Sequence, residues 1–140
     1  MSHNPPPTRE ASRGPGLSLL VLKTRRLAEL RAFYAALGIE FVEERHGRGP
    51  LHYAGRLGDV IFEVYPLPGE SVLADGAARP ASPADAPSIR LGLIVDRLAE
   101  TLALLRGLPG VVVGEPKTTE WGASVLVRDP DGRPVELSAR

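Results

Sequence analysis

The sequence predicts an α+β fold made of two tandem modules, each with the element order β-α-β-β-β. One observation behind this prediction is that apolar residues alternate as in strands, or recur at helical spacing, in the same order in both halves of the chain. The other is that short sequences recur: RLAE at 26–29 returns at 97–100, and FEV at 62–64 is echoed by VEL at 135–137. The repeated order and the repeated letters together indicate a tandem duplication.

The first module begins with a strand-like run at 17–22. A helix is predicted over 25–37, where apolar residues recur every three or four positions, and it ends at Gly38, a residue type that commonly stops helices. Three further strand-like runs follow, separated by Gly and Pro, at 39–44, 51–54 and 59–65.

The second module repeats this order. A strand is predicted at 88–95 and a helix at 96–106, with Asp96 as its N-cap. Three further strands are expected at 111–113, 123–128 and 133–137.

Low-periodicity segments set the boundaries. Residues 1–16 are rich in Pro and poor in large apolar side chains, which predicts a flexible tail. The first module then covers 17–66, a Pro/Ala-rich linker covers 67–87, and the second module covers 88–140. We expect 17–140 to form one compact domain, because 140 residues is the length of an ordinary single domain.

Composition excludes several classes of function. The chain has 17 basic and 17 acidic residues without a long block of either sign, so neither nucleic acid nor an anionic membrane is predicted as a partner. It has no cysteine, and no run approaches the roughly 18 apolar residues of a membrane span. We therefore expect a cytoplasmic protein whose partner is a small molecule.

Two glutamates interrupt apolar strands and raise the question of what they face. Side chains alternate between the two faces of a strand, so each strand can be sorted by position. This sorting places Glu63, Arg90 and Glu136 on the faces that carry no helix, together with Ile61, Tyr65 and Ser138. Either the three charged side chains converge in one cavity, or each glutamate is a polar residue on a half-exposed strand.

Other residues are weaker candidates. His52 either lines the cavity from a middle strand, as a metal ligand or proton acceptor, or is a plain polar strand residue. Tyr65 and Trp121 either stack on a flat ligand at the cavity mouth or pack beneath the linker and hairpin. His46, in a glycine-rich turn, and Glu43–Glu44 are interpreted as solvated surface.

The order of motifs resembles the vicinal oxygen chelate superfamily, which includes glyoxalases, bleomycin-resistance proteins, fosfomycin-resistance enzymes and extradiol dioxygenases. The motifs are FYxxLG at 33–38, VIFEVYP at 60–66, WG at 121–122, RDPDG at 128–132 and VEL at 135–137. The resemblance covers about 17–139. It implies a cupped, eight-stranded half-barrel around one cavity, and a homodimer.

The resemblance also implies where a metal would bind. Enzymes of the superfamily hold a divalent metal with one residue, commonly His, from the first strand of each module and one carboxylate from the last strand of each. Glu63 and Glu136 match the carboxylate positions. The first-strand positions are Leu17, or Ser18 if the register slips by one, and Arg90, and neither a leucine nor an arginine can ligate a metal.

These departures lead to the hypothesis that Arg90 pairs with both glutamates in place of a metal. No cofactor is then expected. The alternative is a divalent metal (Mg, Mn, Fe, Ni or Zn) held by Glu63 and Glu136, with His52 as a further ligand.

Three functions remain open. The first is metal-independent binding of a small organic molecule in the cavity between the modules. The second is a metal-dependent lyase, isomerase or dioxygenase, and the third is a catalytically silent dimer. The residues predicted to line the cavity are Leu17, His52, Ile61, Glu63, Tyr65, Arg90, Trp121, Glu136 and Ser138.

Overall fold

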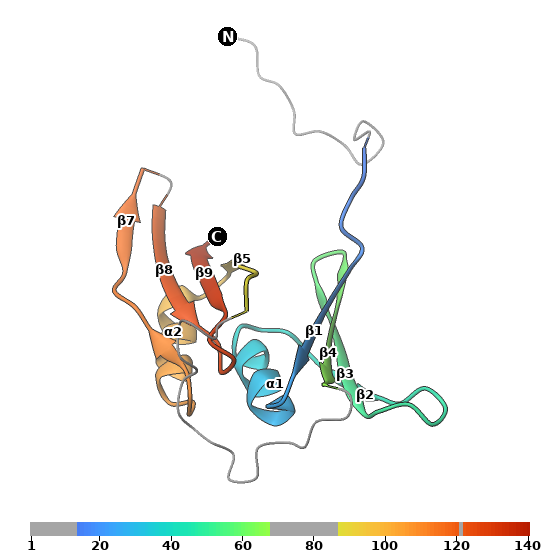
Figure 1. The fold of residues 1–140 in the computed structure, drawn as a ribbon. Coiled ribbons are helices and arrows are strands. Elements are labelled where there is room, and N and C mark those ends of the chain that lie inside the picture. The colour runs from blue at the N-terminus through green and yellow to red at the C-terminus, as the bar shows by residue number, and fades with distance from the viewer. Residues whose placement is uncertain (1–13, 68–86, 121) are drawn as a thin grey trace.

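A computed structural model describes residues 14–67, 87–120 and 122–140. The predicted linker at 67–87 lies almost wholly outside these ranges, as do Trp121 and most of the predicted tail. The described residues contain two helices and nine strands (Figure 1): β1 (Leu19–Thr24), α1 (Leu27–Ala36), β2 (Val42–Glu44), β3 (His52–Leu57), β4 (Val60–Pro66), β5 (Leu91–Val95), α2 (Leu98–Arg106), β6 (Val112–Val113), β7 (Lys117–Thr119), β8 (Gly122–Arg128) and β9 (Pro134–Ala139).

The two halves form two sheets with the same connectivity. The first sheet has the order β1-β4-β3-β2, and the second has the order β5-β9-β8-β6 with β7 also paired to β8. In each sheet the first strand lies parallel to the last one, and the remaining pairs are antiparallel. A helix supplies the crossover that a parallel pair needs. The predicted α+β class and the two tandem modules are confirmed.

The second module holds one strand more than predicted. The expected strand at 111–113 is β6, and the chain then pairs with β8 a second time through β7. Between the two lies Gly114, whose N–H donates to the carbonyl of Leu126 at 2.9 Å. A Cβ at Gly114 would stand 2.7 Å from that oxygen. The sequence does not reveal β7, because its three residues are all exposed and polar and show no alternation.

The predicted N-cap of the second helix is wrong. α2 begins one residue later than Asp96 allows, with Arg97 at the N-cap position and no side-chain cap. The carboxylate of Asp96 instead accepts from Nε of Arg140 at 2.7 Å. The C-terminal residue therefore competes for the oxygen that would have capped the helix.

Burial confirms the sorting of strand faces. In β4 and β9 the side chains of Phe62, Val64, Val135 and Leu137 are fully buried, whereas the residues between them are not. The buried face of each sheet packs on a helix, and α1 also packs on α2. Figure 1 shows α1 beside the first sheet and toward the second module. Glu63, Arg90 and Glu136 thus lie on the helix-free faces.

A buried carboxylate joins the two modules. Asp129, in the turn between β8 and β9, is fully buried and accepts a 2.8 Å hydrogen bond from Oη of Tyr34 on α1. Its oxygens also accept from the backbone N–H groups of Asp131 and Arg133 and, at 2.5 Å, from Nη1 of Arg133. Burial, reinforced by the nearby charge of Asp129, raises the pKa of Tyr34 well above its usual value. The hydroxyl of Tyr34 is therefore a firm donor.

Neither helix in the described ranges is long and apolar enough to cross a membrane.

Candidate functional site

The helix-free face of the second sheet carries a cavity of about 460 Å³. Arg90, just before β5, and Glu136, on the neighbouring β9, form an ion pair there with Nη2 and Oε2 2.8 Å apart. Both side chains are about half exposed, at 59% and 43%. The pairing follows from the sheet register: Leu91 lies opposite Val135, so Arg90 and Glu136 are close neighbours on one face.

The lining of this cavity mixes charge with apolar surface. Cations come from Arg90, Lys117 and Arg128, and carboxylates from Glu115 and Glu136. Because Glu136 is engaged by Arg90, the remaining groups leave the lining with a slight excess of positive charge. Apolar contact is provided by Val112 and Leu126, which are both exposed at roughly two-fifths of their surface.

Glu63 has a different partner from the one hypothesised. Its Oε2 lies 3.7 Å from Nε2 of His52, and among the described residues no ion pair connects it to Arg90. The two glutamates lie in separate sheets, and the cavity that contains Arg90 and Glu136 draws its lining from the second module. The structure therefore forms the Arg90–Glu136 half of the hypothesised cluster.

The side chain of His52 lies on the helix-free face of the first sheet, on β3, which is flanked by β2 and β4. Glu44 on β2 lies directly opposite it in the register, and its Oε1 is 3.4 Å from Nε2 of His52. On the other side the ring of Tyr65 stacks on the imidazole with centroids 4.0 Å apart and planes 9° apart. His46, in the loop after β2, places its Nε2 3.8 Å from the same oxygen of Glu44.

The sequence predicts solvated surface at Glu44 and His46, whereas the structure gathers both residues around His52. The three residue types are visible in the sequence, but their proximity depends on strand pairing, because the pairing of β2 with β3 brings Glu44 opposite His52. Two histidines and a carboxylate then gather within 4.8 Å of one another.

The register also corrects the first-strand position. Arg90 immediately precedes Leu91, which lies opposite Val135, so Arg90 stands two residues before the level of Glu136. In the first sheet Ile61, two residues before Glu63, lies opposite Leu19. The counterpart of Arg90 is therefore Leu19, not Leu17 or Ser18.

The other predicted cavity residues are spread over the two sheets. Leu17 precedes β1 and is 67% exposed, and the backbone carbonyl of Ser18 accepts from the N–H of Ile61 at 3.0 Å. Ile61 itself is 44% exposed on the first sheet. Ser138 lies on β9 between Ile94 and Ser124. None of them joins the Arg90–Glu136 pair directly.

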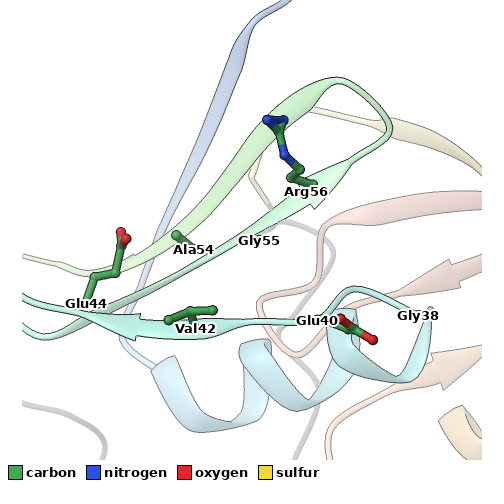
Figure 2. A pocket seen from close by; sticks show the side chains of 7 residues that line it. All are labelled: Gly38, Glu40, Val42, Glu44, Ala54, Gly55 and Arg56. Atoms are coloured by element: carbon green, nitrogen blue, oxygen red, sulfur yellow. The ribbon is translucent and has the colours of Figure 1, made fainter.

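A second cavity, of about 500 Å³, lies along β2 and β3. Figure 2 shows Glu44 and Arg56 projecting from the same face of this hairpin, one near each end, with Ala54 between them. Its floor requires a glycine: a Cβ at Gly55 would lie 2.6 Å from Cγ2 of Ile39 and 2.9 Å from the carbonyl oxygen of Glu40.

Comparison with known proteins identifies the fold. No family model and no curated protein matches the chain. Among solved structures, an integron cassette protein from V. cholerae is 26% identical with a TM-score of 0.58, and covers 91% of this chain and 97% of its own.

Two resistance proteins are also similar. A bleomycin resistance determinant encoded on the transposon Tn5 is 23% identical with a TM-score of 0.54, and covers 90% of this chain and 98% of its own. The fosfomycin resistance protein FosX from Mesorhizobium loti is 15% identical with a TM-score of 0.61, and the match covers 90% of this chain and 92% of FosX. The two-module α+β fold of the described residues, in which the sheets form no closed barrel, matches the fold of these proteins.

Proposed function

We propose that this chain, which has the fold of the vicinal oxygen chelate superfamily, binds a small organic molecule on the helix-free face of its second module, without a metal between Arg90 and Glu136. The observation that carries the proposal is the 2.8 Å ion pair between these two side chains. The carboxylate that would ligate a metal is already held by a cation of the protein.

The residues at the superfamily's metal positions do not fit a metal. They are Leu19, Glu63, Arg90 and Glu136. Leucine offers no donor atom, and a guanidinium is permanently protonated and donates only. A divalent cation beside Glu136 would also be repelled by the positive charge of Arg90. We therefore assign no step of chemistry to a metal at this position.

The lining suggests the kind of ligand. Lys117 and Arg128 favour an anionic or hydrogen-bond-accepting group, while Val112 and Leu126 favour an apolar part of the same molecule. Polyanions are not favoured, because Glu115 lies in the same lining. A neutral or singly charged organic molecule with one polar end matches this mixture best.

A second copy of the chain is proposed to cover the helix-free faces. Large apolar side chains are exposed on both: Leu19 at 48% and Ile61 at 44% on the first sheet, Ile94 at 61% and Leu126 at 38% on the second. Leu19 and Ile61 lie opposite each other in the register, so their exposed apolar surface is adjacent, and such surface marks an interaction site. Light scattering on the purified chain tests this, and a monomer at all concentrations would exclude the dimer.

The binding proposal is tested by thermal shift and calorimetry with bleomycin, fosfomycin and a panel of small carboxylic acids, in buffer containing EDTA. We expect at least one compound to stabilise the chain in the presence of EDTA, and Arg90→Gln to weaken its binding by about tenfold or more. Arg97→Gln is the matched control, since Arg97 is an exposed arginine whose one ion pair among the described residues is with Glu100. Binding that requires a metal, and that Glu136→Gln abolishes together with the metal, would refute the proposal.

A further inference from the structure

We propose that Glu44, His46 and His52 form a site for a divalent transition metal, with zinc as the best match, and that Glu63 lies within reach as a fourth ligand. This site is confined to the first module. Three of its ligands come from β2, the loop after it and β3, and only Glu63 comes from a last strand, β4. No ligand comes from the second module, so the site does not depend on the binding function proposed there.

The strongest evidence is the state of His52. Its side chain is 1% exposed, and its Nε2 is a buried polar atom without a hydrogen-bond partner among the described residues. Buried polar atoms are almost always satisfied, so an orphan of this kind calls for an explanation such as a bound ion. Nε2 is also the atom that faces the carboxylates of Glu44 and Glu63.

The other ring nitrogen fixes the tautomer that a metal needs. Nδ1 of His52 lies 3.2 Å from the carbonyl oxygen of Pro50, which can only accept a hydrogen bond. In the neutral ring Nδ1 therefore carries the hydrogen and Nε2 presents its lone pair. Metal-binding histidines are held in this way, with the second nitrogen donating to a carbonyl or carboxylate.

Stacking holds the ring in place. The imidazole of His52 stacks on the ring of Tyr65 with centroids 4.0 Å apart, and the ring centroid of His46 lies 5.1 Å from that of His52. Stacking on Tyr65 and the fixed position of His52 in β3 together restrict the direction in which Nε2 points. The least mobile ligand is thus also the most buried one.

The distances match a nearly assembled site. In tetrahedral zinc sites with bonds of about 2.0–2.2 Å, neighbouring ligand atoms lie roughly 3.3–3.6 Å apart. Here Oε1 of Glu44 is 3.4 Å from Nε2 of His52 and 3.8 Å from Nε2 of His46. Oε2 of Glu63 is 3.7 Å from Nε2 of His52. The ligand atoms of Glu44, His46 and His52 all lie within 4.8 Å of one another, so movements of about 1 Å in the side chains of Glu44 and His46 would complete the geometry.

The donor set selects the metal. Two imidazole nitrogens with carboxylate oxygens suit zinc and similar transition metals, whereas magnesium and calcium prefer oxygen alone. Two carboxylates facing one histidine also carry an excess of negative charge that a divalent cation would neutralise. His46 is 73% and Glu44 38% exposed, so an ion can enter from solvent.

The test uses the full chain without a polyhistidine tag. The sequence has three histidines, and a His3→Ala background leaves His46 and His52 as the only ones. Zinc binding is measured by competition with a chromogenic chelator, and Co²⁺ replaces zinc to report the ligand field by visible absorption. We expect one metal per chain, tetrahedral Co²⁺ bands, and a thermal midpoint that rises when zinc is added.

Two exposed ligands are then removed one at a time. His46→Ala and Glu44→Gln should each weaken zinc binding by about tenfold or more and reduce the Co²⁺ bands, while the fold is retained because both side chains are at the surface. Glu43→Gln is the matched control: it is the preceding residue of β2, exposed and on the opposite face. It should leave zinc binding unchanged.

Three results would overturn the proposal. One is the absence of stoichiometric binding of zinc or Co²⁺. Another is binding that neither His46→Ala nor Glu44→Gln weakens. The third is binding that Glu136→Gln abolishes, which would assign the metal to the superfamily position and leave Glu44 and His46 without a role.

Discussion

Tyr34 and Asp129 lie 95 residues apart in sequence, yet the hydroxyl of one donates to the carboxylate of the other at 2.8 Å, in a fully buried environment. The bond joins the helix of the first module to the last turn of the second. Around it, Oγ1 of Thr24 donates to Asp131, and the guanidinium of Arg26 donates to the carbonyl of Pro130. The turn between β8 and β9 therefore fixes how the two modules sit on each other.

Tyr34→Phe removes this hydrogen bond without changing the shape of the core. We expect the free energy of unfolding to fall by about 1–2 kcal/mol, below the upper range for hydrogen bonds to charged groups because Asp129 keeps its other donors. Urea denaturation measures the change. Tyr53→Phe is the control, since within the described part of the chain its hydroxyl makes one exposed 3.5 Å contact, with Glu43. An equal loss of stability in both variants would contradict the assignment.

Asp129→Ala should be more damaging, because Arg133 is only 4% exposed and would lose its nearer counter-charge, leaving Asp131 at 3.8 Å. Breaking one partner of a buried ion pair costs about 3–5 kcal/mol. The comparison is Asp96→Ala, which breaks an exposed pair with Arg140 and should cost under about 1 kcal/mol. Similar losses of stability in the two variants would show that Asp129 is not a structural link.

Asp131 gives the turn a pH dependence. Burial raises its pKa above 3.8, with Asp129 adding to the effect and Thr24 and Arg133 opposing it. The native state therefore holds the proton more tightly than the unfolded chain, so this contribution to stability is present below about pH 3.8 and is lost as pH rises through the folded pKa. In Asp131→Asn the amide oxygen can still accept from Thr24.

We expect the stability of Asp131→Asn relative to the unmodified chain to increase as pH rises across that window and then to level off. Denaturant titrations at a series of pH values measure it. A relative stability that falls with rising pH would show that the ion-pair partners outweigh burial.

Much of the fold could be predicted from the sequence because alternation and helical spacing are local signals. The alternation of side chains along a strand is enough to predict that Phe62 and Val64 are buried and that Ile61 and Glu63 are less buried. The strand β7 could not be predicted, because Lys117–Thr119 forms a strand through pairing with β8 and has no apolar pattern of its own.

The site was predicted less completely for a related reason. Parity assigns a residue to a face, but not to a neighbour on another strand. Glu63 was therefore placed on the correct face, while its contact with His52 depends on the pairing of β3 with β4. The buried partner of Asp129 in the RDPDG motif, Tyr34, lies too far away in sequence to be inferred.

Gly55→Ala tests the close packing of β3 against Ile39 and Glu40 beneath the first-module cavity. The added methyl group would meet Ile39 and the carbonyl oxygen of Glu40 inside 3 Å, so one of them must move. We expect a loss of about 1–3 kcal/mol in the free energy of unfolding. Gly92→Ala is the matched control in a strand with no atom within 4 Å, and should change stability by less than about 1 kcal/mol.

Arg90 and Glu136 should matter more for binding than for stability. Both side chains are about half exposed, and ion pairs in such positions contribute roughly 0.2–1 kcal/mol. A double-mutant cycle with Arg90→Gln and Glu136→Gln, measured by denaturation, should therefore give a coupling energy under about 1 kcal/mol. The same variants should weaken ligand binding by about tenfold, because the pair lines the cavity. A coupling of several kcal/mol with unchanged ligand affinity would mean that the pair is structural, and the ligand would then have to be sought at another face of the chain.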